Sequence, residues 1–335
     1  MTPQLDTSLV GTLRLHEDSI GEVMARARDD AEMICGYLRW SVRALDRELK
    51  TAPNEVEFNL VHADSRPTLS EVIVGLDALA SVSLWRFSQL ARAVLIHVAN
   101  DDSIAAALVG RGLIEGAACA AAEGQKLLDL AQEDVSIAEL SEKLWEVGSD
   151  SLMGTRQTAF VESGRYSSRV NIMTRIERAT KLWDTDQVAN YYAVLSDASH
   201  PAIESVGSFV SATSREGART RVLLARDARS INEVSSIAVW SLALLTRPTL
   251  YSVDEMRFSA RKLLARAFTE KADLDEALVK QQTPGRNDPC LCGSGAKSKN
   301  CAHEFVNRWP SGQEGSTFES WKRALDAQNI NQTRQ

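Results

Sequence analysis

Apolar residues recur at spacings of three, four and seven through most of the first 280 residues. The first clear example lies between Ser19 and Lys50, where the pattern places apolar side chains on one helical face. These positions are Ile20, Val23, Met24, Ala27, Ala31, Ile34, Leu38 and Leu45. We therefore expect one amphipathic helix here, ended near Pro53 because proline lacks the amide proton that an interior helical residue donates.

The same periodicity predicts further helices as far as residue 280. Their expected bounds are Leu69–Val98, Asp102 or Ser103 to Gln132, Ser136–Val147, Val170–Trp183, Gln187–Ala198, Glu233–Leu245 and Val253–Lys280. Gly148 is the expected stop of the helix that begins at Ser136, and Thr220–Leu224 is the best strand candidate. Since there is no internal repeat and no alternation of strands with helices, the predicted fold class is all-α, with a multi-helix body.

The composition is that of an ordinary globular protein, with 44% hydrophobic and 25% charged residues. The net charge is −7, and residues 283–335 carry seven Lys or Arg against five Asp or Glu, so the excess acid lies in the helical body. An acidic body argues against broad electrostatic binding to nucleic acid or anionic lipid. The apolar window Ile104–Ala122 contains Arg111 and Glu115, which favours a buried helix over a membrane span. With no signal-peptide pattern at the N-terminus, we expect a cytoplasmic protein.

After Gln282 the composition changes to a short polar segment that contains three of the five cysteines. Cys290, Cys292 and Cys301 lie within twelve residues and are followed by His303. The segment has almost no apolar side chains, so burial cannot hold it together. Structural zinc takes four sulfur or nitrogen ligands in a closed tetrahedron, and its binding supplies folding free energy. The odd number of cysteines also favours a metal site over disulfides.

These residues resemble the SEC-C motif, the zinc-binding module at the C-terminus of the SecA translocation ATPase and of many unrelated bacterial proteins. The matching features are Gly285-Arg286-Asn287-Asp288-Pro289, Cys290-x-Cys292, Gly293-Ser294-Gly295, the lysines that follow, and the eight-residue gap to Cys301. The resemblance implies one structural zinc ion with Cys290, Cys292 and Cys301 as ligands. It also implies docking, since in SecA the module contacts a chaperone and the ribosome.

The fourth zinc ligand is where the sequence departs most from the motif, which places Cys or His directly after the third cysteine. Here Ala302 intervenes, and His303 is the preferred ligand because a histidine reaches further than a cysteine. A water molecule or a carboxylate such as Asp288 is the alternative. Leu291 also replaces the usual proline. A closed site of three sulfurs and one nitrogen leaves no position open for substrate, so we expect the zinc to be structural.

The chain is thus divided into a helical domain of unknown function (1–282), the SEC-C-like zinc knuckle (283–306) and a tail (307–335). In the tail, Ser316-Thr317-Phe318-Glu319 has the pattern of a capping box and predicts a short amphipathic helix.

One polar constellation lies in the helical body. Arg111 and Glu115 are one turn apart in the most apolar helix, where a charged pair asks for a buried partner or a functional role. His200 follows in a Leu-Ser…His-Pro turn. This combination resembles in part the helical domains of abortive-infection and HEPN-like proteins, some of which cleave RNA with an Arg and a His. Their R-x4–6-H spacing is absent, and a structural ion pair and a capping or core histidine are the alternative roles.

The sequence therefore favours a non-enzymatic, bacterial-type adaptor or regulator whose knuckle docks a protein, ribosome or RNA partner. The alternative is a HEPN-like ribonuclease or phage-defence effector with Arg111, Glu115 and His200 in its polar centre. An enzyme needs these three side chains to converge, whereas an adaptor tolerates them scattered. We find no phosphate-binding glycine loop, no His-Glu-x-x-His helix and no Gly-x-Ser-x-Gly elbow that would indicate another enzyme class.

Overall fold

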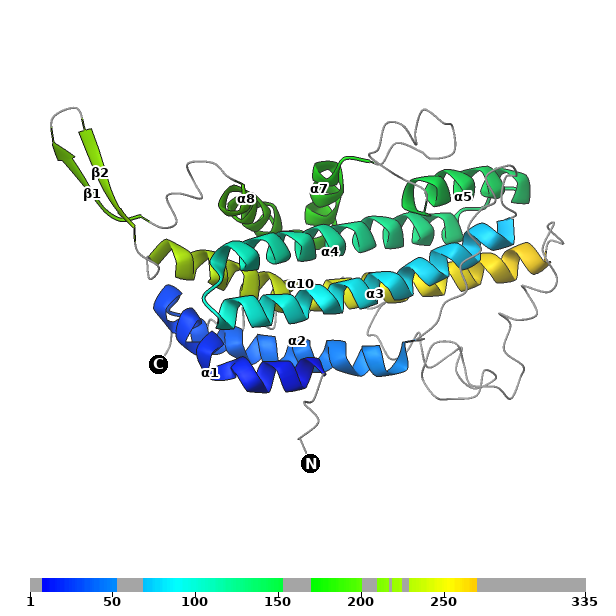
Figure 1. Cartoon of the computed structure of the whole chain (residues 1–335). Coiled ribbons are helices and arrows are strands. Elements are labelled where there is room, and N and C mark those ends of the chain that lie inside the picture. Colours follow the sequence, from blue (N-terminus) through cyan, green and yellow to red (C-terminus); the bar gives the residue numbers. More distant parts are fainter. Residues whose placement is uncertain are drawn as a thin grey trace, which may run out of the picture. The chain divides into compact units, whose positions relative to one another are not determined.

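The computed structural model describes residues 8–52, 69–152, 170–200, 210–216, 219–224 and 229–269. These residues are helical apart from one two-stranded hairpin, which confirms the predicted all-α class (Figure 1). The helices are α1 (Leu9–Ala27), α2 (Ala31–Thr51), α3 (Leu69–Ala99), α4 (Ser103–Gln132), α5 (Ile137–Leu152), α7 (Ile172–Trp183), α8 (Gln187–Ser199) and α10 (Arg229–Thr269). The predicted knuckle and the tail lie outside the described residues.

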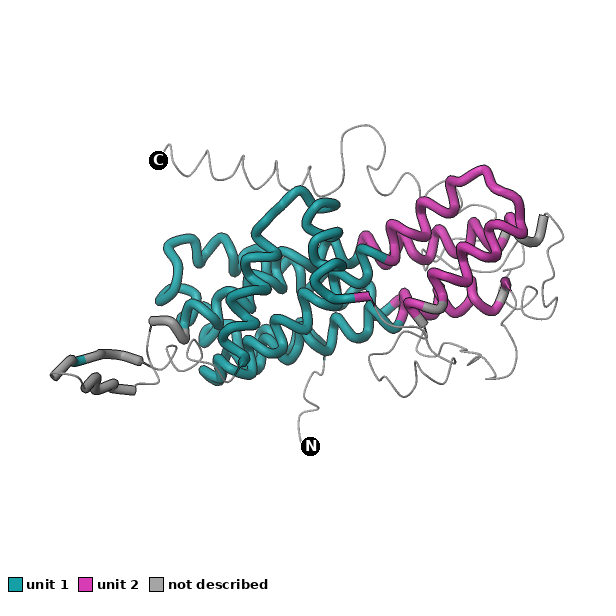
Figure 2. Tube along the Cα trace, turned by 90° about the horizontal axis from the view of Figure 1, so that it is seen from above, with its two compact units in different colours: residues 1–50, 82–122, 171–250 teal, residues 51–81, 123–170, 251–335 magenta. Residues whose placement is uncertain are grey.

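The described helices form two compact units (Figure 2). Unit 1 contains the described parts of residues 1–50, 82–122 and 171–250, and unit 2 those of residues 51–81, 123–170 and 251–335. Helices α3, α4 and α10 contribute residues to both units. The sequence did not predict this division, because its boundaries in α3, α4 and α10 lie inside continuous helices and no linker separates the units there.

The expected single helix over residues 19–50 is wrong, since the structure has α1 and α2 with a break between them. Arg28 leaves helical geometry, with φ −150° and ψ 139°. Its Nε and Nη2 donate to the two carboxylate oxygens of Asp30 at 2.8 and 3.3 Å. Its guanidinium also lies 5.8 Å from the ring centroid of Trp240 on α10. Aspartate is more favourable at helix ends than in helix interiors, and Asp29 and Asp30 both lie at this break. The contacts of Arg28 stabilise the turn, although the spacing of apolar residues continues through it without interruption.

Helices α3 and α4 begin and end within one residue of their predicted bounds. Asp102 Oδ1 accepts a hydrogen bond from the Ala105 backbone N–H at 3.4 Å, which makes Asp102 the N-cap of α4. Among the described helices α4 has the length and hydropathy of a membrane span, yet half of its most apolar window is buried. Fully buried positions on α4 include Leu113, Ile114, Ala117, Ala118 and Ala121. A core helix of a folded domain has these same properties.

The structure corrects two other predictions, which concern where a helix ends. Helix α5 continues through Gly148, where a β-carbon would lie 2.7 Å from Val72 Cγ1 of α3, so this glycine serves helix packing in unit 2 and does not end the helix. The helices expected at 233–245 and 253–280 are one helix, α10, with Pro248 inside it. An interior proline costs about 3 kcal/mol. The buried apolar side chains on both sides of Pro248 offset that cost.

The described strands form one antiparallel hairpin of β1 (Val210–Glu216) and β2 (Arg219–Leu224) (Figure 1). Arg215 pairs with Thr220 and Glu216 with Arg219. The predicted strand is therefore confirmed, while its partner β1 was not predicted. The polar sequence of β1 has no apolar alternation, which is the signal that strand prediction requires.

Candidate functional site

Helices α4 and α8 approach each other closely in unit 1 because α4 has a glycine at their contact. A β-carbon at Gly110 would lie 3.1 Å from Leu195 Cδ1 of α8 and 3.0 Å from Ala238 Cβ of α10. Leu195 is fully buried. The missing side chain at Gly110 thus lets two helices pack against α4, and this packing sets the distance at which polar side chains of α8 meet those of α4.

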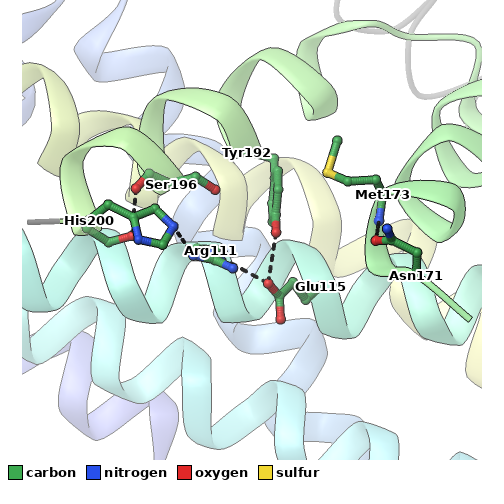
Figure 3. A network of polar contacts seen from close by, with 8 residues as sticks. Arg111, Glu115, Asn171, Met173, Tyr192, Ser196 and His200 are labelled. Carbon is green, nitrogen blue, oxygen red and sulfur yellow. Dashed lines mark hydrogen bonds and ion pairs between the residues drawn. The ribbon is translucent and has the colours of Figure 1, made fainter. Parts of the chain in front are cut away.

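The structure brings Arg111, Glu115 and His200 together, as an enzymatic role would require (Figure 3). Arg111 Nε donates to Glu115 Oε1 at 3.0 Å, and Arg111 Nη1 lies 3.3 Å from His200 Nε2. Tyr192 completes the cluster: its hydroxyl donates to Glu115 Oε1 at 3.1 Å. The Arg111 guanidinium carbon also lies 5.4 Å from the Tyr192 ring centroid, within cation–π range.

In this cluster the positive charge of Arg111 is balanced by the negative charge of Glu115. Burial lowers the pKa of Arg111, but its hydrogen bond to Glu115 and the neighbouring charges outweigh this, and the net pKa is raised. The guanidinium can only donate hydrogen bonds, so His200 Nε2 is the acceptor in its contact with Arg111. Arg111 and Glu115 are each about a quarter exposed, and His200 is exposed.

Sequence reasoning missed Tyr192 as a member of this cluster. Tyr192 lies on α8, and His200 is the C-cap residue that follows this helix, so both belong to the segment that packs against α4. Arg111 lies on α4 and His200 at the end of α8, so the convergence does not reproduce an Arg and a His spaced along a single helix. The resemblance of the helical body to HEPN-like domains stays a prediction.

A second polar cluster, which was not predicted from the sequence, lies in unit 2. Glu255 of α10 makes a hydrogen bond with Tyr251 and lies near the carboxylate of Asp129 on α4. Burial raises the pKa of the Glu255 carboxyl to about 7, and the charge of Asp129 adds to this. Asp129 in turn accepts a hydrogen bond from Gln125 Nε2 at 2.7 Å. Unlike Glu115, Glu255 has no cation among these neighbours.

An open pocket lies where α7 ends and α8 begins. Its lining residues are Glu177, Thr180, Lys181, Asp184, Thr185 and Asp186, and no predicted site residue is among them. In the part of the chain that the structure describes, no three His, Cys, Asp or Glu side chains gather closely enough to hold a metal ion. The predicted zinc ligands Cys290, Cys292, Cys301 and His303 lie outside those residues, so they remain predictions.

Comparison with known proteins identifies a zinc-binding type of module at the C-terminus. The model of the SEC-C motif matches residues 286–303, which confirms the resemblance found in the sequence. This match lies outside the helical body and spans all four predicted zinc ligands.

Relatives with similar segments include the protein translocase subunit SecA of two bacteria. That of Chlorobium phaeobacteroides is 58% identical over 31 residues, and that of Prosthecochloris aestuarii is 67% identical over 33 residues. These matches cover 9% and 10% of this chain but 3% of each SecA. The uncharacterized protein YecA of Escherichia coli K12 is 42% identical over 52 residues, or 15% of this chain and 24% of YecA. The chain therefore matches only a small part of each relative. No solved structure matches this chain.

Proposed function

We propose that this protein is a zinc-binding, non-enzymatic adaptor or regulator of the cytoplasm, which docks a protein or ribonucleoprotein partner through its SEC-C motif. The observation that carries the proposal is the match of the motif over residues 286–303. Cys290, Cys292, Cys301 and His303 hold one structural zinc ion. A site closed by four protein ligands leaves no position for a substrate, so its chemistry suits a docking surface better than catalysis.

The charge of the motif favours an acidic partner surface or RNA phosphate. Arg286, Lys297, Lys299 and Arg308 lie in or next to the motif, in a chain whose net charge is −7. A local basic segment on an acidic protein attracts polyanions to that segment while the rest of the surface repels them. Docking through the motif is therefore expected to weaken as salt rises.

The test compares the full chain with Cys290→Ser/Cys292→Ser, and uses Cys35→Ser/Cys119→Ser as a control that removes two cysteines outside the motif. Metal analysis should find about one zinc per chain in the wild type and the control, and none in the motif variant. Affinity purification from cells followed by mass spectrometry should recover one partner with the wild type and the control only. Equal recovery with the motif variant would show that the motif is not the docking element.

The alternative, an RNA-cleaving or phage-defence effector, rests on the convergence of Arg111, Glu115 and His200. We favour the adaptor because the Arg111 donors are engaged by Glu115 and His200, and because the single-helix spacing of the resembling nucleases is absent. An assay for RNA cleavage separates the two. Cleavage by the full chain that is abolished in both Arg111→Lys and His200→Asn, with the fold intact by circular dichroism, would replace the adaptor hypothesis.

A further inference from the structure

The segment around the described hairpin carries an excess of positive charge. Residues 210–229, which contain the hairpin and the start of α10, carry five arginines against two carboxylates. The whole chain has a net charge of −7, so this segment opposes the overall balance. Arginine is the side chain best suited to phosphate, because its planar guanidinium donates two parallel hydrogen bonds and never loses its charge.

The backbone register places these arginines on both faces of the ribbon. Arg219 and Arg221 are two residues apart on β2 and share one face, at positions about 6.8 Å apart. Arg215 on β1 pairs with Thr220, so it belongs to the other face. All three positions are near the turn, whereas the apolar residues occupy register positions away from it. Those apolar residues are Val210, Val222, Leu223 and Leu224.

The hairpin is also narrow enough to enter a groove. Its two strands pair only with each other in the described part of the chain. The residues between them, Gly217 and Ala218, have the sequence typical of a two-residue connection. Two strands about 4.8 Å apart form a ribbon, and the major groove of B-form DNA, about 12 Å wide, admits such a ribbon.

We propose that the β1–β2 hairpin binds double-stranded DNA by entering the major groove, with its arginines at the phosphates of both bordering strands. A groove presents phosphates on two sides, and this arrangement matches arginine positions on two faces. A flat acidic protein surface would engage one face only. The major groove of an RNA helix is too deep and narrow for a ribbon, which favours DNA over RNA. The inference is independent of the function proposed for the SEC-C motif.

The test is fluorescence anisotropy of the full chain with a labelled DNA duplex of about 20 bp, titrated between about 50 and 200 mM salt. We expect binding that weakens steeply with salt. The variant Arg215→Ala/Arg219→Ala/Arg221→Ala should bind at least about tenfold more weakly at the lowest salt, and its salt slope should fall by about 3. Replacing the same three arginines by lysine should keep most of the slope, since the charges remain.

A matched control separates the hairpin from net charge. Arg14→Ala/Arg43→Ala/Arg47→Ala removes three exposed charges from α1 and α2, and it should change neither affinity nor slope by more than about twofold. The proposal is overturned if the wild type does not bind the duplex at low salt, or if the control triple loses as much binding as the hairpin triple. Tighter binding to an RNA duplex or to polyglutamate would overturn it equally. Removing zinc with Cys290→Ser should leave DNA binding unchanged, which keeps this result distinct from a failure of the docking function.

Discussion

The helical body and the SEC-C motif differ in composition, and the zinc ion proposed for the motif would give it a different source of folding free energy from that of the body. In the body, apolar side chains are removed from water: Ile34, Leu95, Leu113 and Leu195 have at most 1% exposure. In residues 286–303 the only large aliphatic side chain is Leu291. A segment of that composition gains little from burial, and the proposed zinc ion would supply its folding free energy instead. The comparison teaches that one chain can hold two parts whose stabilities respond to different treatments.

The largest expected effect is the loss of the metal. Chelation, or Cys290→Ser/Cys292→Ser, should reduce zinc from about one per chain to none and remove about 10 kcal/mol of binding free energy from the motif. The thermal unfolding of the helical body, followed by circular dichroism at 222 nm, should stay at the same temperature. A body that melts at a lower temperature without zinc would show that the two parts are not separate in their stability.

The reverse experiment removes core packing and leaves the metal. Leu195→Ala deletes a fully buried side chain that packs against Gly110. Such changes cost about 2–5 kcal/mol, because a cavity remains where the methyl groups were. Urea unfolding should report this loss while the zinc content stays the same. The neighbouring Val194→Ala is the matched control: Val194 is 41% exposed, so its truncation should cost less than about 0.5 kcal/mol.

The fold was predictable from the sequence where apolar period and capping residues agree. Helix α4 has both, α3 has a long apolar period, and the ends of these two helices were predicted to within one residue. Prediction failed where a tertiary contact decides the outcome. The Arg28 guanidinium lies over Trp240 of α10 at the break between α1 and α2, and the close approach of Val72 of α3 explains a glycine inside α5. A proline such as Pro248 normally predicts the end of a helix, yet α10 continues through it.

The candidate site was predictable to a similar extent. Arg111 and Glu115 stood out because charges are rare in an apolar helix, and the structure pairs them with His200. Tyr192 was missed because an aromatic residue on an amphipathic helix has the same pattern whether it packs or donates a hydrogen bond. Glu255 was missed because its environment comes from Asp129 on another helix, more than a hundred residues earlier in the chain. The zinc ligands were predicted from the resemblance to the SEC-C motif; they lie outside the described residues and stay a prediction.

The smallest expected effect concerns the carboxyl group of Glu255, whose ionised form is destabilised by burial in the helical body. Burial raises the pKa of Glu255 from 4.5 to about 7. The folded protein therefore keeps a proton on Glu255 that the unfolded chain has lost, so stability falls as pH rises from 4.5 to about 7 and stays low above it. Glu255→Gln keeps an acceptor for Tyr251 and removes the charge. At about pH 8 it should raise the free energy of unfolding by about 1–3 kcal/mol, and at about pH 4 the gain should vanish.

The exposed Glu177 provides the control for this last prediction, because Glu177→Gln removes the same charge from α7 without changing a buried environment. Urea unfolding at both pH values measures all three proteins, and the metal content is followed in parallel. A gain that is equal at both pH values would mean that glutamine packs better and that titration of Glu255 plays no part. A gain restricted to high pH, with zinc unchanged, would show that the body has its own pH-dependent weakness, which zinc in the SEC-C motif neither causes nor relieves.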